Sequence, residues 1–513
     1  MAVFNAKNKQ FKIEKNKAGG VSYKKVGEIQ KAKQTVANII LTHKDLNTRL
    51  YYHSDPQEEI SEAIKTLLNH GKAKYVLKAI AFARNVGALR SISHFSLIEY
   101  FSYKGNKPSP NGAIKYIQKT LVRPDDATEI LAGLSNIGKI PNAFRRAVKK
   151  SLEEDWDAYQ LRKYYGDKRK AKVSDLIKLS HPVPKNTIQA ETFNRAVKGK
   201  RFLQSIETAQ TVNTSQNTSV RERSLKYLEM LKEKKLGYMA LLKNLVNIAK
   251  GLDKEEINVV KEALEVEKAI IGSKVLPYRF LQSYIALQKS DLPKAMRKEL
   301  VESLEKAILT ASKNVLQKMG VQDGEKLHFI IDVSGSMEGE PLMHAVSLAL
   351  PGVVNAGGSL TLFGTCYETL DIEGKGVFEI FEEHFNFGWA IAAKNGDKIG
   401  WGTNIRAALD AIKTNVEKGK DSVIVFSDMQ LYDIGDGGGG YINQKGFDSV
   451  FKGHLPKVTI FWDVQPYNTG LPVKADFNRH VYSLAGVSQL FYEYLDEVIA
   501  NGGIVNVIEK YTV

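Results

Sequence analysis

The chain has 513 residues and carries 73 Lys and Arg against 57 Asp and Glu, a formal net charge of +16. One hydrophobic core rarely serves a chain of this length, so we expect two or three domains. The absence of a run of about 18 apolar residues argues against a membrane span, and the polar N-terminus does not resemble a signal peptide. With a single cysteine and therefore no internal disulfide, we expect a reducing, cytoplasmic location.

The charge is divided unevenly along the chain. Residues 1–320 carry 59 basic and 32 acidic residues, a net charge of +27, whereas residues 321–513 carry 14 and 25, a net charge of −11. An excess of cations on one half attracts polyanions, of which nucleic acid is the usual one. The alternative is a solvated, lysine-rich surface, which would not require so unequal a division.

The basic part, residues 1–320, is predicted to be helical throughout. Apolar residues recur at helical spacing in segment after segment, with turn residues between the segments. Antiparallel helix pairs joined by short turns favour a stack of HEAT-like repeats, although no strict repeat period is present. The predicted helices lie within residues 61–85, 126–137, 142–165, 237–250, 255–271 and 294–319.

The pattern changes after about residue 320. Short apolar, β-rich runs, "KLHFIID", "SLTLFGT", "DSVIVFSD" and "KVTIFWDV", alternate with segments that have helical periodicity. Continuous apolar strands between helices predict a parallel sheet that is covered on both faces. The helices are expected at residues 341–354, 404–416 and 487–502. The predicted fold class is therefore a helical-repeat domain, 1–320, followed by a doubly wound α/β domain, 321–513.

Oxygen-bearing side chains gather at the predicted carboxyl ends of these strands, where ligands bind in such folds. Asp332, Ser334 and Ser336 alternate in "DVSGS", so an extended backbone directs all three to one side. Thr403 lies in a glycine-rich loop that opens a helix, and Asp428 directly follows a strand. Hard divalent cations, Mg²⁺ in particular, prefer oxygen ligands. Two carboxylates and three hydroxyls would leave a coordination position for a carboxylate or phosphate from outside.

Each of these residues also has a purely structural interpretation. Thr403 could be a helix N-cap, and Ser334 and Ser336 could cap the helix that begins near Pro341. Asp428 could be a solvated strand end. The combination of all three segments in this order favours the metal site.

Residues 325–513 resemble the von Willebrand factor A domain, and these three segments resemble its metal-ion-dependent adhesion site. The resemblance implies a doubly wound parallel sheet and a bound divalent cation, Mg²⁺ being the expected ion, with its ligands matched residue by residue. The matching residues are Asp332, Ser334, Ser336, Thr403 and Asp428.

The basic half resembles the Ro autoantigen, or TROVE, family through "KVSDLIKLSHPVP" (172–184), "YMALLKNLVNI" (238–248) and "KVLPYRFLQSY" (274–284). The resemblance implies a closed ring of HEAT-like repeats with a von Willebrand A domain. It also implies binding of small noncoding Y RNAs on the outer face and of single-stranded ends of misfolded RNAs in the central hole. Exoribonucleases such as polynucleotide phosphorylase are the implied protein partners, and a monomer is expected.

The densest mixture of basic and aromatic residues lies at residues 161–182. Cations neutralise phosphates, whereas aromatic rings and histidine can stack on or hydrogen-bond to exposed bases. The resemblance places RNA contacts on Lys163, on Lys168 or Arg169, and on His181. The alternative is a solvated loop with a helix-capping histidine. The candidate RNA-binding residues of this stretch are Lys163, Lys168, Arg169, Lys170, Lys172 and His181.

A second basic strip lies in "NAFRRAVKKSLEEDW", where Arg145, Arg146, Lys149 and Lys150 have helical spacing on one face. It could contact RNA, or it could be a solvated face paired with Glu153 and Glu154 one turn later.

The sequence features are compatible with three functions. The first is a noncatalytic RNA-binding scaffold in RNA quality control or decay. The second is a metal-dependent adhesion or adaptor module that binds acidic protein ligands. The third, an RNA-processing enzyme, is disfavoured because hydrolysis would require a second metal about 3.5–4 Å away or an activated water, and the predicted site holds one ion. We therefore expect no enzymatic activity.

Overall fold

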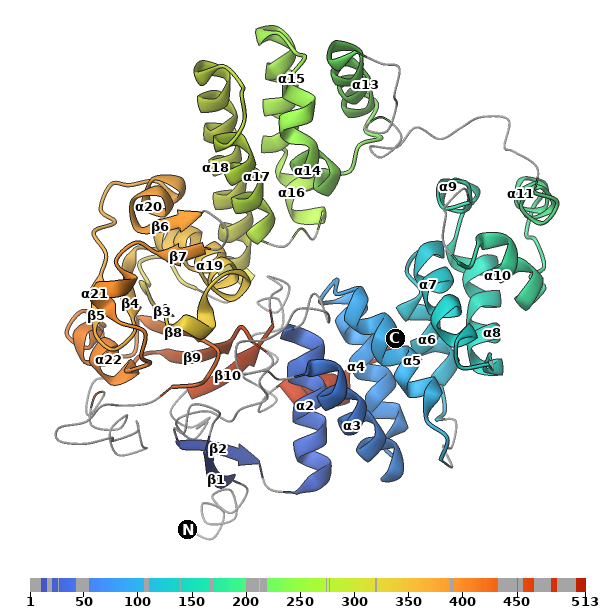
Figure 1. The fold of residues 1–513 in the computed structure, drawn as a ribbon, viewed down its shortest axis with the longest axis horizontal. Helices are drawn as coiled ribbons and strands as arrows, with labels where there is room; N and C mark the ends of the chain where they lie inside the picture. The colour runs from blue at the N-terminus through green and yellow to red at the C-terminus, as the bar shows by residue number, and fades with distance from the viewer. Residues whose placement is uncertain are drawn as a thin grey trace. The chain divides into compact units, whose positions relative to one another are not determined.

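The computed structural model describes residues 11–15, 21–25, 27–42, 55–105, 110–138, 140–165, 170–199, 212, 219–273, 275, 277–318, 321–387, 391–431, 450, 455–465, 481–486 and 504–513. The chain forms two compact units (Figure 1). The first, the helical unit, comprises Gly27–Arg49, Asp55–Thr208 and Ile504–Val513. The second, the sheet-containing unit, comprises Met1–Val26, Leu50–Ser54 and Ala209–Gly503.

The helical unit is built from short amphipathic helices whose ends follow the capping rules. In α3, the Asp55 side chain accepts hydrogen bonds from the backbone N–H groups of Gln57 and Glu58, and Pro56 occupies the first turn, where its missing N–H is not needed. Apolar residues such as Ile60 and Leu67 are buried on one face of this helix. The described helices are α2 (Glu28–Thr42), α3 (Pro56–Asn69), α4 (Ala73–Asn85), α5 (Ser91–Ser102), α6 (Ala113–Thr120), α7 (Pro124–Ser135), α8 (Asn142–Lys150) with a π-helical turn (Ser151–Asp155), α9 (Ala158–Lys163), α10 (Val173–Ser180), α11 (Thr187–Val197) and α25 (Ile504–Lys510).

Helix α25 comes from the far end of the sequence and packs against α2 and α4 near the beginning of the chain. The rings of Phe82 in α4 and Tyr511 meet edge to face, with centroids 5.4 Å apart. Lys33 in α2 forms an ion pair with Glu509. The last residues therefore complete the core of the helical unit.

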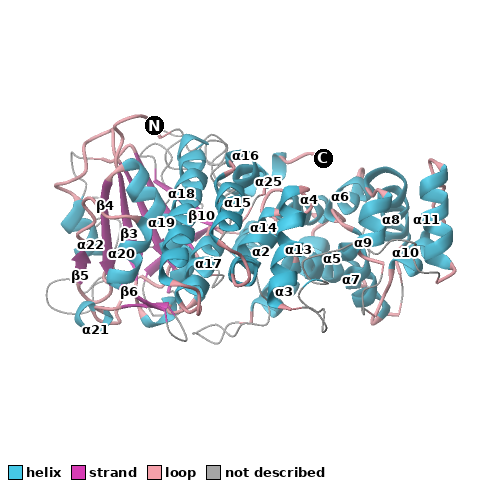
Figure 2. Cartoon of the chain, turned by 90° about the horizontal axis from the view of Figure 1, so that it is seen from above, coloured by secondary structure: helices cyan, strands magenta, loops and turns pink. Residues whose placement is uncertain are grey.

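The sheet-containing unit combines helices, a mixed six-stranded sheet and two small hairpins. Figure 2 shows the strands β3 and β4 with α19 beside them. Its helices are α13 (Val220–Lys232), α14 (Tyr238–Ala249), α15 (Lys254–Glu265), α16 (Glu267–Gly272), α17 (Tyr278–Gln288), α18 (Lys294–Lys318), the 3₁₀ turn η2 (Gly335–Met337), α19 (Glu340–Ala356), α20 (Val377–His384), α21 (Gly396–Ile399) and α22 (Ile405–Ile412). Its strands are β1 (Phe11–Lys15), β2 (Val21–Lys25), β3 (Leu327–Asp332), β4 (Gly358–Phe363), β5 (Tyr367–Thr369), β6 (Phe385–Phe387), β7 (Ile391–Ala393), β8 (Ser422–Ser427), β9 (Val458–Asp463) and β10 (Val481–Ala485).

The strand order of the main sheet is β10-β9-β8-β3-β4-β5. The first five strands pair in parallel, as the apolar runs predicted, and every residue of the central strands β3 and β8 is buried. Strand β5 runs antiparallel to β4, so the prediction of a wholly parallel sheet is wrong at this edge. Only residues 364–366 separate β4 from β5, and because so short a segment leaves no room for a crossover helix, the chain makes a tight reversal.

Both faces of the sheet are covered by helices. Side chains alternate along a strand, so Phe329 and Ile330 of β3 point to opposite faces. Phe329 lies against Gly352 of α19, where even a Cβ atom would approach its ring to 2.6 Å. Ile330 belongs instead to the apolar cluster that contains Ile405 and Leu409 of α22. The doubly wound arrangement follows from these two contacts.

Helices α17 and α18 share a core with the sheet and its helices. Helix α18 packs along α19, and the ring of Tyr284 in α17 stacks on that of Phe378 in α20. The predicted boundary at residue 320 therefore lies inside the sheet-containing unit and marks a change of secondary structure. The assignment of 1–320 and 321–513 as domains stays a prediction, as do the closed ring and the HEAT-like class of the repeats.

Two further predictions from the sequence concern secondary structure. The hairpin of β1 and β2 is an exception to the predicted all-helical character of residues 1–320. The helix expected at 487–502 lies outside the described residues. Among the helices that the structure describes, none is long and apolar enough to cross a bilayer.

Candidate functional site

The carboxyl ends of β3 and β8 bring the predicted acidic residues to one edge of the sheet. Asp332 ends β3, and Asp428 directly follows β8, the neighbouring parallel strand. The hydroxyl of Ser427 donates a hydrogen bond of 2.7 Å to Asp332 Oδ2 and ties the two strand ends together. Both carboxyl groups are fully buried.

The loop after β3 folds back on Asp332. The Ser334 N–H donates to Asp332 Oδ1 at 2.9 Å, and the Oγ atoms of Ser334 and Ser336 lie 3.2 Å apart. Both serines are buried, and neither hydroxyl caps a helix: the residue that precedes α19 is Gly339, with a left-handed φ of 85°. The interpretation of these serines as caps of that helix is therefore wrong.

Thr403 joins the same cluster from the loop before α22. Its hydroxyl donates to the carbonyl oxygen of Gln430 at 2.9 Å, and the Gln430 N–H donates to Asp428 Oδ1 at 3.1 Å. The N-cap of α22 is Asn404, whose side chain accepts from the Ala407 N–H. Thr403 is therefore not the N-cap, and its buried hydroxyl contacts the loop that carries Asp428.

Among the described residues, this cluster contains two carboxyl groups and no positively charged side chain. Burial, and then the charge of Asp428, raise the pKa of Asp332 above its usual range. Burial also raises the pKa of Asp428, an effect that the Ser336 hydroxyl opposes. Within the described part of the chain no ion pair to either carboxylate is formed, and Asp428 Oδ2 has no hydrogen-bond partner.

These residues fit a hard divalent cation. Their donors are carboxylate and hydroxyl oxygens, and an orphaned, buried carboxylate oxygen is favourable only beside a proton or a cation. No group of three Asp, Glu, His or Cys side chains among the described residues is arranged to hold an ion directly. The donors that the chain offers would therefore be completed by water, as is usual for Mg²⁺.

Sequence reasoning missed one acidic residue at this edge. Asp463 ends β9, the next parallel strand, and it is 3% exposed. Its signal was the same as that of Asp428, because "VTIFWD" and "VIVFSD" are both apolar runs that end in aspartate.

The candidate RNA-binding residues lie on α8, α9 and α10 of the helical unit. Lys163 is exposed at the end of α9, and its ammonium lies 5.8 Å from the centre of the Tyr164 ring. Lys170 and Lys172 are exposed just before α10, and His181 is exposed as its C-cap, with φ 48°. Lys168 and Arg169 lie outside the described residues.

The second basic strip lies on α8. Arg145 and Arg146 are exposed, whereas Lys149 is half-buried and lies 3.9 Å from Glu153. Salt bridging with the following turn, the alternative for this strip, is therefore present at Lys149.

The fold brings the two predicted strips together. Helix α8 packs against α10, and Glu153 Oε1 accepts a hydrogen bond of 2.7 Å from the Val183 N–H, two residues after His181. We call the exposed residues of α8, of the end of α9 and of α10 with its C-cap the α8–α10 surface. Tyr159 lies 48% exposed on α9 and adds an aromatic ring to it.

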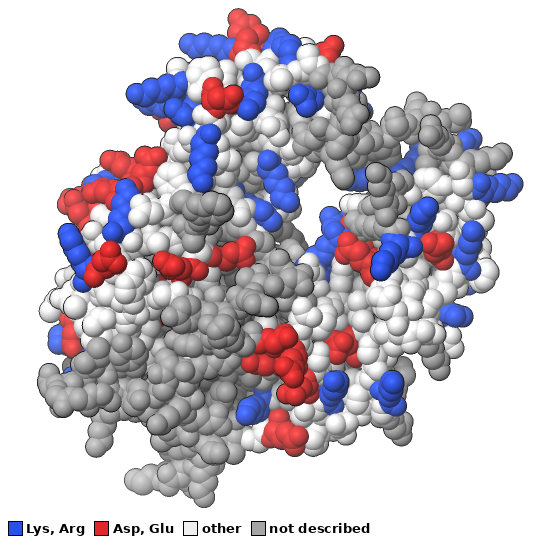
Figure 3. Space-filling model, in the orientation of Figure 1, with Lys and Arg blue, Asp and Glu red and all other residues white. Residues whose placement is uncertain are grey.

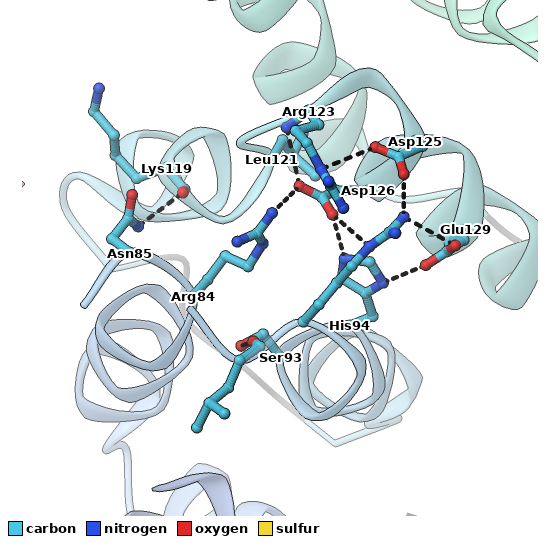
Figure 4. A network of polar contacts seen from close by, with 12 residues as sticks. Arg84, Asn85, Ser93, His94, Lys119, Leu121, Arg123, Asp125, Asp126 and Glu129 are labelled. Atoms are coloured by element: carbon cyan, nitrogen blue, oxygen red, sulfur yellow. Dashed lines mark hydrogen bonds and ion pairs between the residues drawn. The ribbon is translucent and has the colours of Figure 1, made fainter. Parts of the chain in front are cut away.

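A buried ionic network lies among α4, α5 and α7 (Figure 4), and α7 packs against α10. Asp126 in α7 accepts hydrogen bonds from Arg84 at 2.8 Å and from Arg90 at 2.9 Å, and it contacts His94 at 3.0 Å. Burial alone would raise the pKa of Asp126, but the His94 hydrogen bond and the arginine charges outweigh it and lower that pKa. Arg123 continues the network to Tyr164, with the guanidinium carbon 5.9 Å from the ring centre.

A polar groove of about 440 Å³ lies between α14 and α17 of the sheet-containing unit. Its lining includes the exposed side chains of Lys243, Lys250 and Lys289, and Asp291 pairs with Lys250 at 3.0 Å. On the face shown in Figure 3, lysine and arginine side chains are spread over the helices of both units rather than gathered in one patch. The groove is a local concentration of lysine side chains that the sequence analysis did not predict.

Comparisons with known proteins identify both the domain and the fold. Residues 226–330, which include α14 to α17, match the family model of the TROVE domain. No curated protein matches the sequence. Among solved structures, the Ro (RSR) protein of Deinococcus radiodurans matches with a TM-score of 0.56 and 14% sequence identity, over 92% of this chain and 100% of that chain. Residues 226–330 are therefore similar to the TROVE domain, and the chain has a fold similar to that of the Ro protein.

Proposed function

We propose that the chain is a noncatalytic RNA-binding protein. The observation that carries the proposal is the packing of α8 against α10, which joins two sequence segments that each carry exposed cations. A surface of exposed cations and aromatic rings neutralises phosphates and stacks on unpaired bases, the two contacts by which proteins hold structured RNA with loops. The TROVE match supports the same class of ligand.

The RNA ligands that we propose are small noncoding Y-like RNAs and the single-stranded ends of misfolded RNAs. Their contacts would use the α8–α10 surface for structured RNA and the lysine-lined groove of α14 and α17 for extended strands. The protein would act as a scaffold in RNA quality control, in the cytoplasm, as a monomer and with an exoribonuclease as partner. The family resemblance is the support for these finer roles.

A salt titration of the full chain tests RNA binding. The probe is a hairpin RNA with a single-stranded 3′ extension, and binding is measured by fluorescence anisotropy at several salt concentrations. The affinity of the wild-type protein should fall steeply with salt, because bound cations release counterions from the phosphates. Lys163→Ala with His181→Ser should weaken binding and reduce the salt slope by about one unit, because Lys163 would no longer neutralise a phosphate.

The matched control is Lys65→Ala with Lys418→Ala, which removes exposed lysines of α3 and of the loop before β8. This control should keep most of the wild-type affinity. A flat salt response, or equal losses of affinity in the two double variants, would reject the α8–α10 surface as the RNA-binding site.

A second candidate function is a metal-dependent adaptor, which the buried carboxylates at the ends of β3 and β8 favour. Asp332, Asp428, Ser334, Ser336 and Thr403 would hold a divalent cation, with Mg²⁺ the proposed ion. A bound cation would offset the repulsion between the two carboxylates and would present an open position to a partner's oxygen donor. Calorimetry with MgCl₂ on the wild type and on Asp332→Ala tests this site, because the variant should not bind the ion.

A further inference from the structure

Three aspartates lie at the carboxyl ends of three adjacent parallel strands. Asp463 ends β9 and pairs in register with Ser427 of β8, and the Ser427 hydroxyl donates to Asp332 Oδ2. Asp428 is the next residue after Ser427. The strand register therefore places Asp463 beside the loop of the candidate cation site, on the side opposite to Asp332.

Asp428 and Asp463 have the same local hydrogen bonding. Asp428 Oδ1 accepts from the N–H of Gln430, and Asp463 Oδ1 accepts from the N–H of Gln465 at 2.9 Å. In each carboxyl group the second oxygen, Oδ2, is buried and has no hydrogen-bond partner among the described residues. Two adjacent strand ends thus each leave one carboxylate oxygen that no described residue satisfies.

Among the described residues, no positive charge compensates that of Asp463. The carboxyl group is 3% exposed, and no ion pair to it is formed within the described part of the chain. Burial, and then the charge of Asp428, raise its pKa well above the usual range. A solvated strand end, the ordinary role of such a residue, would be exposed.

We propose that Asp463 is a third carboxylate of the cation site and binds a water ligand of the ion rather than the ion itself. This inference rests on the metal site proposed above. We assign an indirect contact because no group of three acidic, His or Cys side chains among the described residues is arranged to hold an ion directly. Mg²⁺ retains several water ligands in proteins, and carboxylates that hold such waters orient them and strengthen ion binding.

The third carboxylate also determines what the open position of the ion accepts. Two carboxylates neutralise a divalent cation, and a third gives the occupied site a net charge of about −1 by simple charge counting. An incoming carboxylate would then be repelled, whereas water or a neutral oxygen donor would not. The site therefore favours a neutral donor over the acidic ligand that two carboxylates alone would invite.

Metal titration of the full chain tests this role. Asp463→Asn keeps the shape of the side chain and removes its charge, and Asp371→Asn, at an exposed carboxylate of the same unit, is the matched control. We expect Asp463→Asn to weaken Mn²⁺ binding about tenfold, by calorimetry and by the electron paramagnetic resonance signal of free Mn²⁺. The control should bind as the wild type does.

Melting in the absence of divalent ions separates this role from a structural one. Asp463→Asn should leave the melting temperature unchanged or raise it, because it removes one of two neighbouring buried carboxylates. If the variant melts lower and binds Mn²⁺ like the wild type, Asp463 is a structural residue and the inference is overturned. Asp463→Ser provides a second test should the Asn variant fold poorly. A wild-type protein that binds no Mn²⁺ would instead reject the metal site as a whole.

Discussion

The ring of Tyr284 lies flat against the ring of Phe378, with centroids 4.1 Å apart and an interplanar angle of 3°. Tyr284 belongs to α17 of the TROVE match, and Phe378 belongs to α20 beside the sheet. The two rings join parts of the chain that differ in composition and in secondary structure. A fragment that ends at residue 320 would leave Tyr284 exposed, so RNA binding is better tested on the full chain than on the basic part alone.

This ring pair leads to a prediction about stability. Tyr284 is 1% exposed, and Tyr284→Ala should lower the free energy of unfolding by about 3–5 kcal/mol, as truncation of a buried aromatic side chain does. A double-mutant cycle with Phe378→Ala, measured by urea unfolding, should give a coupling of roughly 0.5–1.5 kcal/mol. Tyr159→Ala, at an exposed ring, is the control. Purely additive effects would show that the two rings do not stabilise each other.

The ionic network at Asp126 predicts a dependence of stability on pH. The pKa of Asp126 is lower in the folded than in the unfolded chain, so its contribution is present above about pH 4 and is lost as pH falls further. Asp126→Asn should destabilise the protein by about 3–5 kcal/mol at neutral pH, because Arg84 and Arg90 would remain buried without their partner.

The comparison of wild type and Asp126→Asn by thermal melting should show a gap that narrows between about pH 5 and pH 3. Asp157→Asn, a helix cap on α9, provides a control whose effect is local. A gap that stays constant with pH would mean that the charge of Asp126 contributes nothing to stability.

The buried pair of Asp332 and Asp428 predicts the opposite dependence. Their pKa values are raised in the folded chain, so their favourable contribution is full below about pH 4 and is lost as pH rises through the neutral range. Without divalent ions, the melting temperature of the wild type should fall between about pH 5 and pH 8, and that of Asp332→Asn should fall less. Saturating MgCl₂ should remove the fall in the wild type, because a bound cation would hold both carboxylates in their ionised form. Identical pH profiles in the two proteins would contradict the assigned electrostatics.

The groove between α14 and α17 predicts a preference among RNA ligands. Lys243→Ala with Lys289→Ala should weaken binding of an unstructured oligouridylate more than binding of a blunt hairpin, because an extended strand can follow the groove with its phosphates. The salt slope for the oligouridylate should decrease by about one unit for each lysine that neutralises a phosphate. Lys65→Ala with Lys418→Ala again serves as the control, and equal losses of affinity on both RNAs would assign the lysines a nonspecific role.

The sequence predicted those residues of the candidate cation site that follow from apolar strand patterns and from the rule that ligands bind at the carboxyl ends of parallel strands. Asp332 and Asp428 follow apolar strands, and parallel strands place their carboxyl ends at the same edge. Asp463 obeys the same rule and was missed only because it belongs to no motif. The contact between Glu153 and Val183, which joins the two basic strips, could not be predicted because it depends on how α8 packs against α10.

The Asp126 network could not be predicted from the sequence. Its members come from α4, α5 and α7, and each looks like an ordinary surface charge in the sequence. Only the packing of these helices buries them together. The antiparallel β5 was missed for a related reason, since a three-residue edge strand has too short a pattern to reveal its direction.

Helix α25 constrains the order in which the helical unit can fold during synthesis. Residues 504–510 cover α2 and α4, so the ribosome must synthesise these residues before the helical unit can close. Until then the Phe82 ring lacks the Tyr511 partner that it contacts edge to face. Domains that fold during synthesis usually do so from the N-terminus onward. Here α2 and α4 are synthesised long before α25. The apolar surface that α25 covers would therefore be exposed to chaperones until residues 504–510 are made.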